Sequence, residues 1–188
     1  MKVSSVIAGA SAALVAFQAA LYASHGEADL LRPPGAHGEK DFASRCVKCG
    51  KCMEACPYIA IKPARDDAGA AVGTPMIDAR AQACRLCEDF PCVEACPTNA
   101  LRDIETRSDV KMGVAVIDED LCIAFQGMRC EVCYRTCPLI DEAIVIDYRL
   151  REGDAIHSVF APVIDEDKCV GCGLCVERCV VSEPRVAI

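Results

Sequence analysis

Sixteen cysteines, arranged in four groups, constrain the fold of this 188-residue chain more than any other feature. Each group ends with the spacing C-x₃-C. The groups are Cys46, Cys49, Cys52 and Cys56; Cys84, Cys87, Cys92 and Cys96; Cys122, Cys130, Cys133 and Cys137; and Cys169, Cys172, Cys175 and Cys179. Aromatic residues make up only 5% of the chain, so side-chain packing alone offers a thin core. We therefore expect covalent crosslinks or metals to hold the fold together.

The four groups are copies of one repeated unit. Groups one and four share the spacing C-x₂-C-x₂-C-x₃-C, whereas groups two and three have a longer loop. The segment VIDED precedes both Cys122 and Cys169, which makes Cys122 the first cysteine of its group and IAFQGMR an inserted loop. An alanine and an aliphatic residue follow every group. This repetition predicts four units, each with a strand, a cysteine loop, a helical turn carrying the fourth cysteine, and a second strand.

The spacing within a group is typical of cysteines that bind 4Fe–4S clusters. Three thiolates within seven residues can surround one corner of a cluster if the backbone turns tightly, and Gly50, Gly171 and Gly173 permit such turns. In two-cluster ferredoxins the fourth cysteine binds the other cluster and is followed by proline. A proline follows the fourth cysteine in the first three groups. The chain therefore predicts four 4Fe–4S clusters in a small, loop-rich α+β fold of tandem bacterial-ferredoxin-like repeats.

Three other uses of the cysteines fit the pattern less well. A disulfide framework suits an exported chain, but closely spaced cysteines pair poorly with one another. Structural zinc uses separated C-x₂-C pairs, often with histidine, whereas the three histidines of this chain lie outside every group. In a mixed arrangement, one site would hold a 3Fe–4S centre or stay empty.

The spacing leaves open which groups share clusters. Neighbouring groups can pair, or the pairs can be nested, with group one joined to four and group two to three. Nesting is favoured because it matches the two compact groups and the two lengthened ones. The predicted ligand sets are then Cys46, Cys49, Cys52 and Cys179; Cys84, Cys87, Cys92 and Cys137; Cys122, Cys130, Cys133 and Cys96; and Cys169, Cys172, Cys175 and Cys56. The modules would join 46–61 with 163–188 and 78–101 with 116–147, within one four-cluster domain at 46–188.

Residues 1–24 are predicted to form a signal-like or anchoring apolar segment, because no charged residue occurs from Val3 to Ser24. This stretch is long enough to span a bilayer. Three interpretations stay open: the core of a signal peptide, an uncleaved membrane anchor, and a buried helix. Residues 25–45, which include Pro33-Pro34-Gly35, are expected to form a linker.

These motifs resemble those of the MauM/NapG family of ferredoxin-type proteins. The matching segments are DLLRPPGA (29–36), CVKCGKCMEACPY (46–58), CEDFPCVEACPTNAL (87–101), CIAFQGMRCEVCYRTCPLIDEAI (122–144) and CVGCGLCVERC (169–179). The fourth of these segments is the most specific, because its seven-residue loop is unusual among ferredoxins. The resemblance implies four 4Fe–4S clusters bound by the sixteen cysteines, and electron transfer beside periplasmic nitrate reductase or in methylamine utilisation.

The resemblance also implies partners and a location. We expect a membrane quinol dehydrogenase as electron donor and a periplasmic reductase or small redox protein as acceptor. A periplasmic or membrane-associated protein facing the periplasm would carry a twin-arginine signal, because its clusters are inserted before export. No Arg-Arg pair precedes the apolar run in this sequence, so an upstream start or a signal carried by a partner is a hypothesis.

Nothing in the chain predicts a substrate site, so we expect an electron carrier and not an enzyme. The net charge of −8 argues against nucleic-acid binding, which requires basic residues. The alternatives are an iron–sulfur subunit of a larger membrane-associated oxidoreductase, a methylamine-utilisation ferredoxin, and a maturation or redox-balancing factor.

Two features of the loops bear on electron transfer. Basic residues lie inside or beside the cysteine loops, where a close cation would raise the potential of a cluster. These residues are Lys48, Lys51, Arg85, Arg129, Arg135 and Arg178. In the inserted loop, Phe125 and Met128 are expected either to cover the third cluster or to offer a docking surface.

Overall fold

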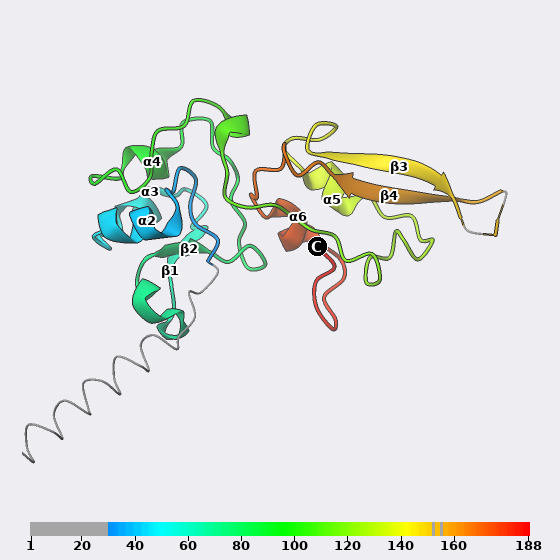
Figure 1. The fold of residues 1–188 in the computed structure, drawn as a ribbon, viewed down its shortest axis with the longest axis horizontal. Coiled ribbons are helices and arrows are strands. Elements are labelled where there is room, and N and C mark those ends of the chain that lie inside the picture. The colour runs from blue at the N-terminus through cyan, green and yellow to red at the C-terminus, as the bar shows by residue number, and fades with distance from the viewer. Residues whose placement is uncertain (1–29, 152, 155) are drawn as a thin grey trace, which may run out of the picture.

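The computed structural model describes residues 30–151, 153–154 and 156–188, which form two lobes side by side (Figure 1). The N-terminal lobe contains the helices α2 (Glu39–Arg45), α3 (Lys51–Ala55) and α4 (Pro91–Glu94), the strands β1 (Ile61–Pro63) and β2 (Pro75–Ile77), and the 3₁₀ turns η1 (Asp66–Ala71) and η2 (Arg107–Asp109). The C-terminal lobe contains α5 (Val132–Thr136), β3 (Ile144–Leu150), β4 (Ser158–Ile164) and α6 (Leu174–Arg178). Helix α6 lies between the two lobes (Figure 1).

Each of the two small sheets in the described chain joins neighbouring cysteine units. β1 follows the first group and pairs antiparallel with β2, which precedes the second; Ile61 lies opposite Ile77. β3 follows the third group and pairs antiparallel with β4, which precedes the fourth; Ile144 lies opposite Ile164. The helical turns follow the same rule, because α3 packs on α4 and α5 packs on α6. Each lobe is therefore one module that contains two consecutive cysteine groups.

Backbone hydrogen bonds close each module at its outer ends. In the N-terminal lobe the His37 N–H donates to the Ala100 carbonyl at 3.4 Å. In the C-terminal lobe the Asp118 N–H donates to the Ala187 carbonyl at 2.9 Å. The alanine after the second unit of each module thus lies beside the segment that precedes the first unit. Both modules have the same reciprocal arrangement.

The main apolar core lies in the N-terminal lobe. Phe42, Leu86 and Val110 are among its largest fully buried side chains. Val170 and Leu174, which come from the fourth cysteine unit, join the same core. The fourth unit is therefore packed against the N-terminal lobe as well as against its own.

The linker predicted at 25–45 is wrong for its described part, which packs onto the N-terminal lobe. Phe42, in α2, is 0% exposed. The buried Arg32 guanidinium donates to Thr74 Oγ1 at 2.7 Å and to the Pro75 carbonyl at 2.8 Å. It also lies 4.7 Å from the centre of the Phe42 ring. The proline pair prevents a helix at this point, but it does not prevent burial.

The apolar segment predicted at 1–24 lies outside the described residues. Among the helices that the structure describes, none is long and apolar enough to cross a membrane. The predicted α+β class is confirmed by the short helices and two-stranded sheets. Four of the eight expected strands do not form in the described chain: none precedes group one or group three, and none follows group two or group four. Residues 116–118 hold no strand, whereas Val163 and Ile164, at the equivalent positions of the repeat, end β4.

Candidate metal centres

The N-terminal lobe brings the fourth cysteine of group one to the loop of group two. Cys56 lines a pocket with Cys84, Cys87 and Cys92. Helix α3 ends at Ala55, and Cys56 follows it in an extended conformation, so this thiol faces the neighbouring group. The pocket encloses about 350 Å³ of space, part of it open to solvent, and apolar residues form most of the remaining wall.

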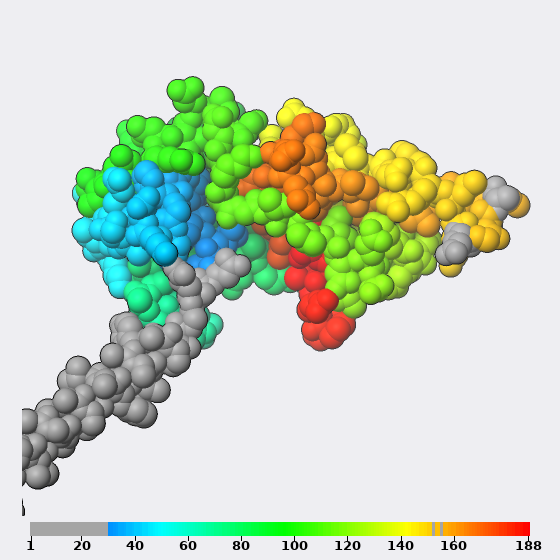
Figure 2. Space-filling model, viewed as in Figure 1, coloured from blue at the N-terminus to red at the C-terminus, as the bar shows by residue number. Residues whose placement is uncertain are grey.

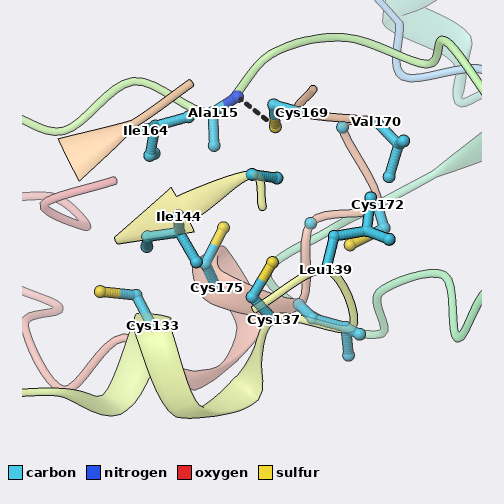
Figure 3. Close-up of a pocket in the computed structure, with 14 residues that line it drawn as sticks. Ala115, Cys133, Cys137, Leu139, Ile144, Ile164, Cys169, Val170, Cys172 and Cys175 are labelled. Carbon is cyan, nitrogen blue, oxygen red and sulfur yellow. Dashed lines mark hydrogen bonds between the residues drawn. The ribbon is translucent and has the colours of Figure 1, made fainter. Parts of the chain in front are cut away.

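Two pockets in the C-terminal lobe have the same plan, in which a fourth cysteine joins three cysteines of the neighbouring group. One pocket, shown in Figure 3, is lined by Cys137 with Cys169, Cys172 and Cys175. The other is lined by Cys179 with Cys122, Cys130 and Cys133. Cys133 also reaches the edge of the first of these pockets, so the two sites adjoin each other.

The remaining four cysteines gather around Cys52. Burial, and then the nearby thiols of Cys46, Cys96 and Cys49, raise the pKa of Cys52 to about 11. Among the sixteen cysteines, all in the described part of the chain, Cys49 alone is exposed. This site is therefore the one with a thiol open to solvent.

The nested pairing predicted from loop length is wrong. It placed Cys179 with Cys46, Cys137 with Cys84, Cys96 with Cys122 and Cys56 with Cys169, and it joined 46–61 with 163–188 and 78–101 with 116–147. Cys56 instead lines the pocket of Cys84, and Cys137 that of Cys169. Strand pairing determines which cysteine groups share a pocket, because β1–β2 and β3–β4 bring consecutive units together. Loop length affects only the turn within a unit. Cys122 lines its pocket with Cys130, as expected of the first cysteine in its group.

The chemistry of these pockets suits a cluster better than a single ion. In the Cys172 pocket the thiols are the only polar side chains, because alanine, leucine, isoleucine, valine and glycine form the rest of the wall. Among the described residues, no three His, Cys, Asp or Glu side chains converge closely enough to hold one metal ion. A 4Fe–4S cluster presents its irons at separate corners and takes one thiolate at each. The four cysteine sets fit that requirement.

Left-handed residues shape the tight turn between the first two cysteines in three of the four groups. Lys48, Leu86 and Gly171 stand immediately before the second cysteine and have φ values of 55°, 48° and 69°. Lys48 is exposed, and its Nζ donates to the Val72 carbonyl at 2.6 Å, so a large side chain is accommodated there. At Gly171 an added Cβ would lie 2.4 Å from the Gly113 backbone, so only glycine fits. The same local turn therefore accommodates a large side chain in the N-terminal lobe but only glycine at position 171 of the C-terminal lobe.

Backbone N–H groups point at individual sulfurs. The Leu86 N–H lies 3.5 Å from Cys84 Sγ, and the Ala115 N–H lies 3.5 Å from Cys169 Sγ, as the dashed line in Figure 3 shows. The Ala60 N–H lies 3.4 Å from Cys56 Sγ. Such donors stabilise negative charge on sulfur and therefore raise the potential of a cluster bound there.

Burial controls the protonation of the thiols that face the pockets. It raises the pKa of Cys92 and of Cys175 to about 12, with neighbouring thiols adding to the effect. Without metal, these thiols keep their protons at neutral pH, so metal binding must displace them. Cys96 differs: burial acts to raise its pKa, but the N–H groups of Leu101, Thr98 and Ala100 outweigh burial and lower the pKa.

Glutamates pair with four of the cations predicted beside the loops. Arg85 and Arg178 pair with Glu177 at 2.8 Å and 3.6 Å, and Arg129 and Arg135 both pair with Glu131. Sequence reasoning missed both glutamates. The i,i+4 spacing of Glu131 and Arg135 was a usable signal, whereas Arg85 and Glu177 are 92 residues apart and gave none.

The inserted loop packs against the β3–β4 hairpin. The Arg149 guanidinium lies 5.5 Å from the centre of the Phe125 ring. Ile123, and neither Phe125 nor Met128, lines the pocket of Cys122. Met128 is 52% exposed. The expectation that Phe125 and Met128 cover this site is therefore wrong, and the docking alternative stays a prediction.

Known protein families match the same two modules. A 4Fe–4S dicluster domain matches at residues 45–100 and again at 126–182. The first match spans cysteine groups one and two, and the second begins inside group three and spans group four. The chain is therefore an iron–sulfur protein built from dicluster modules, consistent with four 4Fe–4S clusters.

Similar proteins place the chain in a particular family. It is 44% identical over 160 residues to the ferredoxin-type protein NapG of Escherichia coli, covering 84% of this chain and 69% of that protein. It is 40% identical over 168 residues to the methylamine utilization ferredoxin-type protein MauM of Methylorubrum extorquens, covering 88% and 75%. The ferredoxin-type protein NapF of Escherichia coli is 27% identical over 153 residues, covering 81% of each chain. The chain belongs to the NapG and MauM family of ferredoxin-type proteins, which confirms the resemblance predicted from its motifs, and it is an iron–sulfur electron-transfer protein.

Proposed function

We propose that this protein relays electrons through four 4Fe–4S clusters, one at each cysteine set. The observation that carries the proposal is the continuous succession of four thiol sites through both lobes. The proposed ligand sets are Cys46, Cys49, Cys52 and Cys96; Cys84, Cys87, Cys92 and Cys56; Cys169, Cys172, Cys175 and Cys137; and Cys122, Cys130, Cys133 and Cys179. When bound, each cluster supplies a carrier for one electron.

The chain's own residues prepare each site for this role. Thiolates anchor the metal, and the apolar walls described above limit the access of water. The N–H groups of Leu86 and Ala115 stabilise charge at sulfur without moving a proton. These are the features by which a protein adjusts the potential of a cluster.

For partners, we propose a membrane quinol dehydrogenase as donor and a reductase of a periplasmic nitrate reductase system as acceptor. The similarity to NapG supports this assignment. It implies a periplasmic or membrane-associated location facing the periplasm. In this role the protein is a carrier without its own substrate.

A methylamine-utilisation ferredoxin is the second candidate. The MauM protein of Methylobacillus flagellatus is 44% identical to this chain over 165 residues, the same identity as for NapG. Identity alone therefore does not favour either partner system. An iron–sulfur subunit bound permanently to a larger oxidoreductase would use the same four sites.

Metal content tests the relay directly. Anaerobically purified protein is expected to contain about sixteen irons and as much acid-labile sulfide per chain, and to show reducible 4Fe–4S signals in a redox-titrated EPR spectrum. Iron-free protein that stays compact would overturn the proposal. Zinc in place of iron would do the same.

Reconstitution tests the partners. Vesicles containing a quinol dehydrogenase and quinol should reduce this protein, which should then reduce the nitrate reductase partner. Chelated, iron-free protein is the control and should not transmit electrons. Reduction only by the methylamine system would favour the second candidate.

A further inference from the structure

Two cysteine sites from different lobes lie against each other at the junction. The Cys84 N–H donates to the Cys172 carbonyl at 3.0 Å. Cys84 lines the pocket that also contains Cys56 in the N-terminal lobe, and Cys172 lines the pocket shown in Figure 3. Figure 2 shows the lobes in broad contact. These two sites are therefore neighbours across the junction.

The Glu177 side chain holds the residues on both sides of Cys84. Its Oε2 accepts the Ala83 N–H at 2.7 Å, and its Oε1 accepts Arg85 Nη2 at 2.8 Å. Glu177 stands two residues after Cys175 on α6, and its side chain is only 13% exposed. The carboxylate thus ties the loop of one site to the helix of the other.

Arg80 strengthens this connection from the N-terminal lobe. Its Nη1 donates to the Val176 carbonyl at 2.8 Å, the Cys179 carbonyl at 3.0 Å and the Glu177 carbonyl at 3.3 Å. Carbonyls in the last turn of a helix lack partners within the helix, and a cation there is stabilised by the helix dipole. Arg80 therefore binds the C-terminal end of α6 across the junction.

A pair of equivalent glycines shows how closely the lobes approach. Gly50 and Gly173 both precede the helix of a compact cysteine group and have φ values of 79° and 81°. A Cβ on Gly50 would meet nothing within 4 Å. A Cβ on Gly173 would lie 2.5 Å from Ala79 Cβ. The local conformation is the same, so the difference comes from the neighbouring lobe.

We propose that Arg80, Arg85 and Glu177 are positioning residues that hold the Cys84 and Cys172 sites at the distance needed for electron transfer between the lobes. This inference rests on the proposed relay. An electron that crosses the junction oxidises the cluster that it leaves and reduces the cluster that it enters, and no proton or chemical group moves with it. The relay then runs from the exposed Cys49 site through the Cys84 and Cys172 sites to the Cys122 site, or in reverse.

Replacement of one carboxylate oxygen of Glu177 tests whether this side chain holds the two sites together. Glu177→Gln keeps the shape of the side chain but weakens its charge-assisted bonds. Amide exchange of Ala83 and Cys84 should rise at least about tenfold, because hydrogen bonds to a charged group are lost. Iron content should stay at the wild-type value. Glu131→Gln is the matched control, because Glu131 is 12% exposed and binds two arginines within its own lobe.

Electron transfer supplies the second measurement. In the fully reduced Glu177→Gln protein, the EPR splitting caused by interacting clusters should narrow, and electron redistribution after a one-electron pulse should slow. Equal effects of Glu177→Gln and Glu131→Gln on the amide exchange of Ala83 and Cys84 would contradict the claim that Glu177 holds the residues around Cys84. Faster exchange with unchanged splitting and redistribution would overturn the positioning role while leaving the relay intact. Failure of the relay itself would appear in the wild-type protein as missing iron or missing redox signals.

The glycine pair provides an independent variant. Gly173→Ala should disturb the junction through its contact with Ala79, and Gly50→Ala should carry only the cost of the left-handed backbone. Faster exchange at Ala83 and Cys84 in Gly173→Ala alone supports the proposal. The same exchange in both variants would contradict it.

Discussion

The two lobes have the same cysteine plan but differ in what stabilises them. The N-terminal lobe surrounds a buried apolar core that includes Phe42 and Leu86. In the C-terminal lobe, α5 buries none of its residues, and the β3–β4 hairpin leaves Tyr148 and Leu150 largely exposed. Figure 2 shows this hairpin extending away from the rest of the molecule. The same arrangement of thiols therefore occurs both in a lobe with a large apolar core and in a lobe with a small one.

The segment that precedes the first cysteine group explains part of this difference. Residues 30–45 add α2, Phe42 and the buried Arg32 to the N-terminal lobe. The corresponding position in the C-terminal lobe, before the third group, is occupied by the connection that starts near Gly113 and has no regular element in the described chain. The C-terminal lobe therefore has less apolar surface to bury.

Iron removal should have the largest effect on stability. The loss of amide protection should differ between the two lobes. Metal binding contributes folding free energy, and a lobe with a small core depends on it most. After anaerobic chelation, amides in β3, β4 and α5 should exchange as in an unfolded chain, whereas α2, β1 and β2 keep part of their protection. Hydrogen exchange with mass spectrometry measures this. Equal loss in both lobes, or earlier loss in the N-terminal lobe, would remove the proposed contrast.

Truncation of Phe42 should have the next largest effect. Phe42→Ala removes a fully buried ring and its contact with Arg32, so it should destabilise the N-terminal lobe by about 3–5 kcal/mol. Phe160→Ala, at a half-buried ring on β4, is the control and should cost less. Anaerobic denaturation followed by loss of cluster absorbance measures both. Similar costs would show that the two lobes depend equally on their aromatic residues.

The smallest effect is expected at a strained residue in the first unit. Ile59 is β-branched, yet its φ is 56°, a left-handed conformation that costs roughly 1–2 kcal/mol. Asn99 occupies the equivalent position of the second unit with φ 52°. Ile59→Asn should therefore stabilise the protein by about 1 kcal/mol, since asparagine tolerates this conformation. Asn99→Ile should destabilise it by a similar amount, and changes of the same sign in both variants would disprove this explanation.

Local features of the fold were predictable from short stretches of sequence. The inserted loop before Cys130 could be identified because VIDED marks the start of two units. The tight turns were expected from glycines such as Gly50 and Gly173, which have left-handed φ values in the structure. The burial of Arg32 was not predictable, because its partners Thr74 and Pro75 lie more than 40 residues away.

The sequence by itself determined the kind of metal site, because three thiols of each group lie within a few residues and their chemistry is local. Only the tertiary structure decided which fourth cysteine completes each set, because strand pairing brings consecutive units together whatever the length of their loops. It also decided which two sites meet between the lobes. That contact includes the pair of Arg85 and Glu177, which are 92 residues apart, and no spacing rule links residues at such a separation.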